Sequence, residues 1–237
     1  MKLTLAITTY NRTDMVLEAF EKVYDHPLID EIVIVDDAST EENWIGLNRA
    51  ILYADMSVRE GSRIKLFRNP VNLGMSRNKA EAISKAKNEW CILFDSDNIL
   101  YPEYLDSLAA CNFEDDGIIY HPQKAEPEHD YSSFSWIDKT NAKDYLGDRD
   151  FRCLLNNSNY VVNRDEYLRI YKYNPDIQEA DTIWMNTNWL KAGNAFYVVP
   201  GMWYAHRKHP ESGWLKGNQA KNIRDANNLQ EEIRLLK

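Results

Sequence analysis

The sequence predicts an α/β fold in which helices cover both faces of a mostly parallel sheet. Short apolar runs alternate with longer segments of helical spacing through residues 1–100. Each apolar run is nearly continuous, as in strands that are buried on both faces. Each run also leads into a polar loop, and in open parallel sheets the ligand lies at the carboxyl ends of the strands.

In the first half of the chain, strands and helices are expected to alternate regularly. The expected strands are residues 2–9, 31–35, 63–67 and 90–95, and the expected helices are residues 14–24, 41–56 and 75–87. Polar loops follow three of these strands, at residues 8–12, 36–40 and 95–98. Because the carboxyl ends of parallel strands meet at one edge, we expect these loops to line one crevice.

The second half of the chain is less regular. A strand is expected at residues 117–120. Residues 121–150 are expected to form a loop with one short helix, because the segment is polar and contains Pro122 and Pro127.

The last part of the chain is expected to contain two helices and two extended runs. A helix over residues 181–192 ends at Gly193, a residue suited to a left-handed cap. Extended runs at residues 196–199 and 202–206 flank a turn at residues 200–201. Residues 218–237 form an amphipathic pattern, which indicates a helix that packs on the domain or on a partner.

Length, charge and cysteine content restrict the class of protein. The 237 residues fit one domain, and a hydrophobic fraction of 44% is enough for a buried core. A formal net charge of −9 argues against binding to nucleic acid or to anionic membrane surfaces. No apolar stretch reaches the length of a membrane span. The three cysteines lack metal-ligand spacing, so a reducing cytoplasm is the expected location.

Asp95 and Asp97 follow the apolar run of residues 90–94 with one residue between them. In an extended chain their side chains point to the same side. Two convergent carboxylates suit Mg²⁺ or Mn²⁺, which keep open positions for waters and phosphates. The expected guest is therefore a nucleotide-linked substrate, although the alternative is that these acids only end a strand and begin a turn.

Five sequence segments carry a resemblance to a known family. They are residues 8–12, 31–39, 72–78, 94–98 and 191–206. In this order and spacing the chain resembles the family 2 glycosyltransferases, inverting sugar-nucleotide enzymes with the GT-A fold. The resemblance implies one GT-A domain over residues 1–237, with a Rossmann-like sheet and a smaller acceptor-side part. Its implied divisions are a nucleotide-sugar-binding half (1–100), an acceptor-binding half (101–215) and a C-terminal amphipathic helix (216–237).

The resemblance also implies contacts to the donor. The nucleotide-sugar-binding candidates are Thr9, Asn11, Arg12, Asp37, Arg77, Asp95 and Ser96. An exposed carboxylate at Asp37 can accept the ring N–H of a uracil-type base, and the alternative is an Asx turn or cap with Ser39. Arg77, just inside a helix, can bind phosphate or base, and the alternative is a salt bridge on the helix face. No role is assigned to Lys79.

A divalent ion, Mn²⁺ or Mg²⁺, is the cofactor that the resemblance implies. Asp97 is the expected metal ligand, and Asp95 contacts the ribose or binds the ion through water. His206 is expected to add a contact to the metal or the diphosphate. His209, three residues further on, is the alternative.

An inverting transfer needs a base that deprotonates the acceptor hydroxyl. Related enzymes carry an acidic pair at the start of the helix that ends at Gly193, whereas here Ala180 separates Glu179 from Asp181. Asp181 is assigned as the base from its distance to Gly193, and Glu179 is the alternative. A plain helix N-cap is the structural interpretation of Asp181.

These assignments predict a metal-dependent inverting glycosyltransferase that uses a nucleotide sugar, with a UDP-sugar favoured. The expected acceptor is a glycan or glycoconjugate, which allows a location peripheral to a membrane, and the C-terminal helix allows a homo-oligomer. Residues 212–214 are a candidate lid. The alternatives are a non-catalytic sugar-nucleotide-binding protein and a nucleotidyltransferase, although residues 8–12 lack the glycine expected of the latter.

Overall fold

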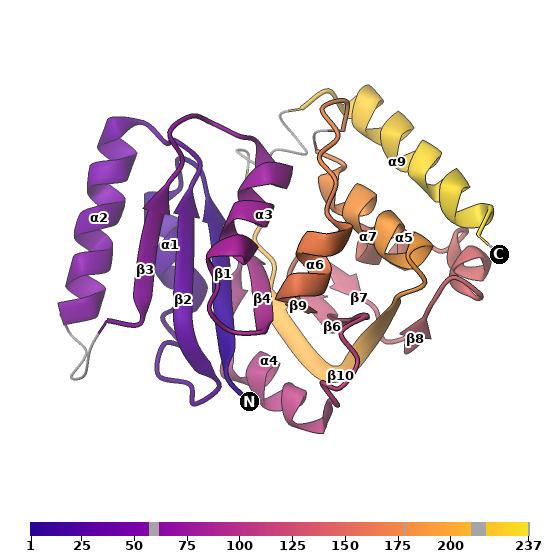
Figure 1. Ribbon diagram of the computed structural model, residues 1–237, viewed down its shortest axis with the longest axis horizontal. Coiled ribbons are helices and arrows are strands. Elements are labelled where there is room, and N and C mark those ends of the chain that lie inside the picture. The colour runs from indigo at the N-terminus through magenta and orange to yellow at the C-terminus, as the bar shows by residue number, and fades with distance from the viewer. Residues whose placement is uncertain (57–61, 178, 210–216, 237) are drawn as a thin grey trace.

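The computed structural model is built around a ten-stranded sheet (Figure 1). It describes residues 1–56, 62–177, 179–209 and 217–236, so the candidate lid at 212–214 lies outside the described residues. The strands are β1 Leu3–Thr9, β2 Ile29–Asp36, β3 Ile64–Arg68, β4 Trp90–Asp95, β5 Ile99–Leu100, β6 Ile118–Glu126, β7 His129–Asp130, β8 Trp136–Ile137, β9 Tyr160–Asn163 and β10 Ala195–Ala205. The main path through the sheet runs β3-β2-β1-β4-β9-β6-β10-β5.

Helices cover both faces of this sheet, as predicted. They are α1 Thr13–Phe20, α2 Glu41–Met56, α3 Met75–Lys85, α4 Pro102–Asp106, α5 Arg149–Leu155, α6 Arg164–Ile170, α7 Asp181–Lys191 and α9 Gln219–Arg234, with short 3-10 turns at Ser107–Ala110 and Ala142–Tyr145. In Figure 1, α3 lies in front of the parallel strands and α1 lies behind them.

The parallel part of the sheet agrees with the sequence prediction. β1 pairs in parallel with β2 and β4, and β2 pairs in parallel with β3. All seven residues of β1 are buried, as are the first five of β4, which explains their continuous apolar sequences. The loops after β1, β2 and β4 therefore leave the sheet at the same edge.

The predicted loop over residues 121–150 is wrong in its first part. Residues 121–126 continue β6, which pairs in parallel with β10 up to Ala205 and Glu126. Pro122 is tolerated because β9 pairs with β6 only through Tyr120, so the missing N–H of the proline costs no ladder bond on that side.

The two extended runs at residues 196–199 and 202–206 belong to one strand, β10, rather than to two. The register against β6 shifts between Val199 and Trp203. Gly201 has a φ of +79° there, so the predicted turn is an irregularity within the strand. β9, α5 and α6 were not predicted, and β9 reverses direction relative to β4 and β6.

The C-terminal helix α9 packs on its own chain. Ala226 and Leu229 lie in a buried cluster with Ala180 and Ile183 of the α7 region. Lys191 of α7 also pairs with Glu232 at 2.7 Å. The structure thus shows packing on the domain, and the homo-oligomer stays a prediction.

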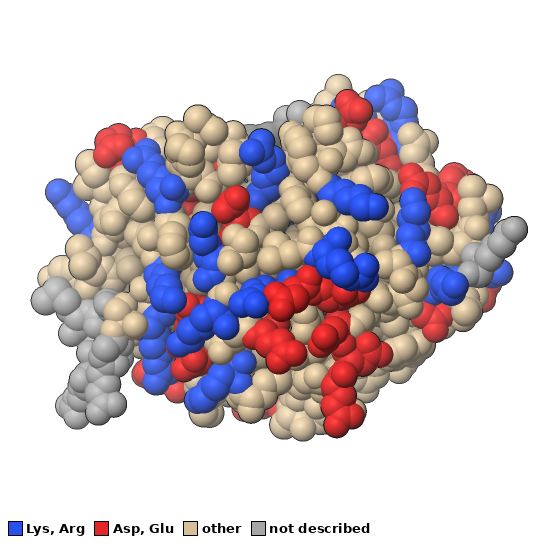
Figure 2. Space-filling view, viewed as in Figure 1, with Lys and Arg blue, Asp and Glu red and all other residues tan. Residues whose placement is uncertain are grey.

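Charged side chains of both signs lie on the face shown in Figure 2. A group of basic side chains left of the centre borders a group of acidic ones below the centre. An anionic ligand that binds on this face would therefore be attracted by individual Lys and Arg side chains close to it. Within the described residues, no helix is both long and apolar enough to cross a lipid bilayer.

His121 of β6 is fully buried in the second half of the sheet. Its ring packs edge-on against Tyr160 and Phe196, with centroids 5.1 and 5.0 Å away. Neither ring nitrogen has a hydrogen-bond partner among the described residues. Burial lowers the pKa of His121 to about 3, so the folded protein holds this ring neutral.

Replacing His121 by Phe is expected to flatten the acid dependence of stability. The unfolded chain binds a proton below about pH 6.5 and the folded chain does not, so stability present above that pH is lost as the pH falls. Between about pH 6.5 and about pH 5, this group alone lowers the free energy of unfolding by about 2 kcal/mol. Urea unfolding of the wild type and H121F across that range measures the difference in slope. If the free energy of unfolding depended on pH equally in both proteins below about pH 6.5, His121 would not be neutral in the folded state. Above about pH 7.5 both proteins should show the same pH dependence, because His121 is then neutral in the folded and unfolded chains.

Candidate functional site

The turn that follows β4 contains both predicted carboxylates. The Ser96 N–H donates to the Thr8 carbonyl of β1 at 3.3 Å, and the Asn98 N–H donates to the Asp95 carbonyl at 3.1 Å. The Ser158 hydroxyl donates to Asp95 Oδ2 at 2.7 Å. The Asp95 side chain is therefore oriented by the segment before β9, which the sequence did not indicate.

Arg207 holds this turn from the other side. Its guanidinium donates to three successive carbonyls of the turn, those of Ser96, Asp97 and Asn98, at 3.2, 2.5 and 3.5 Å. It also contacts Glu18 of α1. An arginine presents its donors in a rigid plane, so it fixes backbone geometry that a lysine would not. These backbone contacts of Arg207 could not be predicted from the sequence.

Asp97 lies between two basic side chains. Its Oδ2 is 2.8 Å from Arg12 Nη1 and 2.9 Å from His209 Nε2. The structure therefore brings His209, the alternative histidine, to the predicted metal ligand. Through this contact His209 Nε2 serves as a hydrogen-bond donor to the ionised carboxylate.

His206 lies close to the same turn but faces Asn98. Its Nδ1 is 3.1 Å from Asn98 Oδ1, which also accepts the N–H of Arg207 at 3.2 Å. Because that oxygen is an acceptor, His206 Nδ1 carries the proton and Nε2 keeps a lone pair. Burial lowers the pKa of His206, although Asp97 and nearby acids oppose this, so the neutral ring is favoured. This tautomer leaves a lone pair on Nε2 for a metal ion, whereas a diphosphate oxygen would need a proton on Nε2, so the geometry favours the metal contact, which stays a prediction.

The residues around this turn fit an ion that is shared with a ligand. Among the described residues, no three acidic, histidine or cysteine side chains converge closely enough to hold an ion by themselves. Asp95 and Asp97 each have a recorded partner on Oδ2, and no described residue donates to either Oδ1. Mg²⁺ and Mn²⁺ commonly bind through one or two carboxylates together with substrate phosphates and waters, and this donor set suits that mode.

Asp37 differs from its prediction, because its carboxylate is buried and not exposed. It is 3% exposed and accepts hydrogen bonds from the Asn69 amide and from the N–H groups of Leu73 and Gly74, at 2.8, 2.8 and 2.9 Å. These donors fix the loop that precedes α3. Among the described residues, Oδ2 accepts a hydrogen bond from the Gly74 N–H alone, so a lone pair there is available to a base N–H.

The contacts to Ser39 proposed in the alternative for Asp37 are made by Asp36 instead. Asp36 accepts the N–H of Ser39 at 3.0 Å and also contacts its hydroxyl. Asn11, with a φ of +52°, joins this loop by donating its N–H to the Ser39 hydroxyl at 2.7 Å. The loops after β1 and β2 are therefore bonded to each other.

Two hydroxyl groups near these loops are buried without partners. They are the side chains of Thr9 at the end of β1 and of Ser96 in the turn, and neither finds a hydrogen bond among the described residues. Buried hydroxyls are usually satisfied, so an unpartnered one at the edge of a site is a place where a ligand can bind. Thr9 is 4% exposed, whereas Ser96 is fully buried.

Asp181, the predicted base, forms a buried ion pair with Lys79. Lys79 Nζ lies 3.0 Å from Asp181 Oδ2 and 2.9 Å from the Thr182 hydroxyl. Asp181 is the first residue of α7, and its cap position is Ala180 without a side-chain cap, so the N-cap interpretation is wrong. Burial works against the charge of Lys79, but Asp181, Asp95 and Asp97 outweigh it and raise the pKa of Lys79.

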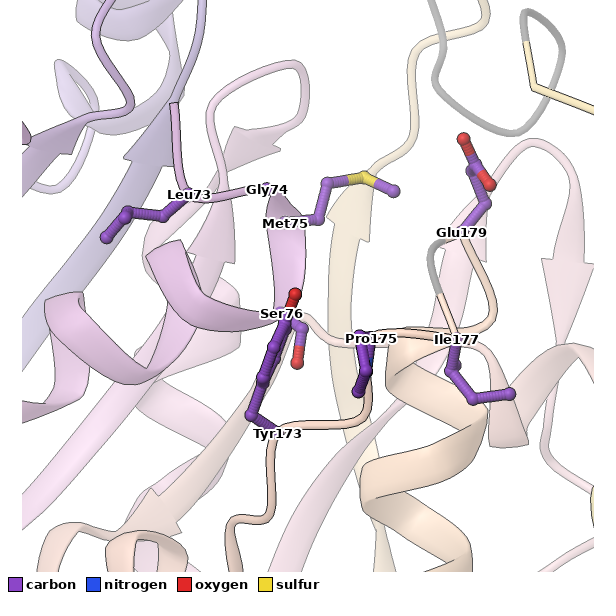
Figure 3. Close-up of a pocket in the computed structure, with 8 residues that line it drawn as sticks. All are labelled: Leu73, Gly74, Met75, Ser76, Tyr173, Pro175, Ile177 and Glu179. Carbon is purple, nitrogen blue, oxygen red and sulfur yellow. The ribbon is translucent and has the colours of Figure 1, made fainter. Parts of the chain in front are cut away.

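Glu179, the alternative base, faces α9 and a cavity of about 240 Å³ (Figure 3). Glu179 Oε2 lies 3.1 Å from the Asn222 amide of α9. A Cβ on Gly217 would lie 2.6 Å from Glu179 Oε1, so the backbone packs closely against this side chain. In Figure 3, Met75 reaches from the start of α3 across the cavity toward the side on which Glu179 lies.

Arg77 lies at the rim of the same cavity. Its guanidinium stacks over the ring of Tyr173, which lines the cavity, at 5.2 Å from the ring centre. The side chain is exposed, so neither of the two predicted roles for Arg77 is decided by these contacts.

Comparisons with known proteins agree with this arrangement. The model for "Glycosyl transferase family 2" matches residues 4–195. No curated protein sequence matches the chain. Among solved structures, S. aureus TarS 1-349 in complex with UDP-GlcNAc is 16% identical with a TM-score of 0.71, over 100% of this chain and 68% of that one.

Two further structures share the fold. The mannosyltransferase PcManGT from Pyrobaculum calidifontis, in complex with GDP-Man and Mn²⁺, is 18% identical with a TM-score of 0.61, over 99% of this chain and 69% of that one. GalNAc-T7 with UDP, GalNAc and Mn²⁺ is 14% identical with a TM-score of 0.67, over 97% of this chain and 48% of that one. At these identities the likeness concerns the fold alone, and the predicted GT-A fold is confirmed.

Proposed function

The chain belongs to glycosyltransferase family 2, and from this membership we propose that it is a metal-dependent inverting enzyme that transfers sugar from a nucleotide sugar to a glycan or glycoconjugate hydroxyl. One observation supports the proposal: Asp181 is bonded to the buried Lys79, and the charges of Asp95 and Asp97 also raise the pKa of that lysine. The proposed donor-binding turn and the proposed base therefore both act on the same buried cation.

The nucleotide is proposed to bind along the loops after β1 and β2. Thr9 offers an unpartnered hydroxyl, and Asp37 offers one remaining lone pair to a uracil-type base. Arg12, now paired with Asp97, can turn to the diphosphate when that carboxylate takes another partner. UDP is favoured as the nucleotide, in line with the TarS and GalNAc-T7 complexes, which carry UDP or UDP-GlcNAc.

A divalent ion is proposed as part of the donor complex. Asp97 would hold it, with Asp95 directly or through water and His206 through Nε2. When bound, Mn²⁺ or Mg²⁺ supplies positive charge that stabilises the leaving diphosphate. The PcManGT and GalNAc-T7 structures contain Mn²⁺, which supports manganese as the first choice.

The chemical step is proposed as a single displacement. Asp181 takes the proton of the acceptor hydroxyl while the hydroxyl oxygen bonds to the anomeric carbon of the donor sugar. The bond from that carbon to the diphosphate oxygen breaks, and its electron pair leaves with the nucleoside diphosphate. The configuration at the anomeric carbon inverts because attack and departure occur on opposite faces. Glu179 is the less favoured base because its carboxylate already contacts the α9 region.

The experiment that tests this function is a donor screen with the full chain. UDP-GlcNAc, UDP-glucose, UDP-galactose and GDP-mannose are incubated with Mn²⁺ and simple glycosides, and nucleoside diphosphate release is followed. Release that depends on Mn²⁺, with a product of inverted anomeric configuration, is expected for one donor. Tight UDP binding without release or transfer for any of these donors would instead indicate a non-catalytic sugar-nucleotide-binding protein.

A further inference from the structure

Lys79 is a charged residue in the buried stripe of α3. Its side chain is 8% exposed and shares that stripe with Asn78, Ala82 and Ile83. A lysine is rarely buried to this extent unless it is paired, because removing its charge from water is costly. Its position therefore has to be explained by its partners.

Those partners come from the two parts of the molecule that would hold donor and acceptor. Lys79 donates to Asp181 Oδ2 and to the Thr182 hydroxyl, both at the start of α7. The charges of Asp95 and Asp97, in the turn after β4, also act on its ammonium. Without the lysine, these three carboxylates would lie near one another with no shared cation.

We infer that Lys79 is a positioning residue for the base Asp181, holding one of its oxygens so that the other faces the acceptor hydroxyl. The inference rests on the proposed function. No described residue donates a hydrogen bond to Asp181 Oδ1, so that oxygen is the one available to the acceptor. A carboxylate with one oxygen hydrogen-bonded has less rotational freedom than an unpaired carboxylate. Correct orientation of the base contributes substantially to general-base catalysis.

Nearby tyrosines do not replace this lysine. The charge of Asp181 contributes to raising the pKa of the phenols of Tyr160 in β9, Tyr167 in α6 and Tyr171. Burial raises the pKa of each of these tyrosines, so each is neutral near pH 7. Lys79 therefore supplies the positive charge next to Asp181 in the described part of the site.

The test compares Lys79→Met with a matched control, Lys65→Met. Lys65 pairs with the buried carboxylate of Glu31 at 2.6 Å, toward the amino ends of the parallel strands, and takes no part in the site. The kcat, the KM for the donor found in the screen, the Kd of UDP and the thermal unfolding midpoint are measured for both variants. K79M is expected to lower kcat about 100-fold with KM within about 3-fold, whereas K65M keeps kcat and lowers only stability.

A double variant separates positioning from loss of structure. In the D181N background, K79M should have no further effect on kcat, because the group that Lys79 orients is already disabled. Lys79→Gln, which keeps a donor without the charge, takes the place of K79M if that variant fails to fold, and the same loss of kcat is expected.

The possible failures are distinguishable. A K79M or K79Q enzyme with wild-type kcat overturns the inference and leaves the proposed function intact. Equal kcat losses in K79M and K65M also overturn it, because they indicate a general effect of removing the lysine partner of a buried carboxylate. A wild-type protein that turns over no donor in the screen overturns the proposed function and, with it, this inference.

Discussion

Replacing Asp97 by Asn should remove Mn²⁺-dependent binding of UDP and lower sugar transfer by about 1,000-fold. Asn has nearly the same size and can still accept from Arg12 and His209, so the turn after β4 should keep its shape. What disappears is the negative charge that attracts a divalent ion. Lewis-acid stabilisation of a leaving group contributes several kcal/mol, and about 1.4 kcal/mol corresponds to a factor of ten in rate.

Calorimetric titration of UDP with and without Mn²⁺ measures the binding part of this prediction. Asp165→Asn serves as the control, because this exposed α6 carboxylate forms an ion pair with Arg164 alone among the described residues and lies outside the site. The control should bind UDP as the wild type does, with the same dependence on Mn²⁺. If D97N gains as much UDP affinity from Mn²⁺ as the wild type, the ion does not bind through Asp97.

The first half of the fold could be predicted because local signals and tertiary structure agree there. β1, β2 and β4 are almost entirely buried, so their sequences are mostly apolar and differ clearly from the helices between them. β6 has mixed polarity over residues 121–126, since only part of that stretch is buried, and the sequence therefore resembled a loop. β9 has four residues, too few to show a period.

The candidate site was predicted less completely, because side-chain partners are set by tertiary contacts. Asp36 and Asp37 are adjacent in sequence, and only the structure shows that Asp36 makes the turn while Asp37 binds the loop before α3. Ser158, which orients Asp95, is 63 residues away from it along the chain. Contacts of this kind leave no local pattern to read.

Lys79 did leave a signal in the sequence. It stands three, four and seven residues before Ala82, Ile83 and Ala86, all apolar, so it occupies the inward stripe of its helix. A lysine in such a stripe is costly to bury without an anionic partner. That pattern indicates a buried ion pair, although the identity of the partner, Asp181, required the structure.

Replacing Asp181 by Asn is expected to lower kcat by about 100- to 10,000-fold with little change in the KM for the donor. A positioned base contributes this much to a transfer reaction, and an amide cannot accept the proton of the acceptor hydroxyl. Donor binding should persist, because the proposed nucleotide contacts lie in the loops after β1 and β2 rather than on α7. The kinetic measurement is the initial rate of transfer at saturating donor and acceptor.

Glu179→Gln is the matched variant, since it removes the other candidate base in the same segment. Its kcat should stay within about 3-fold of the wild type if Glu179 only packs against Gly217 and Asn222. D181N also leaves the buried charge of Lys79 without its partner, so its thermal unfolding midpoint should fall, and rates must be compared below that temperature. A large loss of kcat in E179Q with a nearly active D181N would move the base to Glu179, and the Lys79–Asp181 pair would then be a structural element joining α3 to α7.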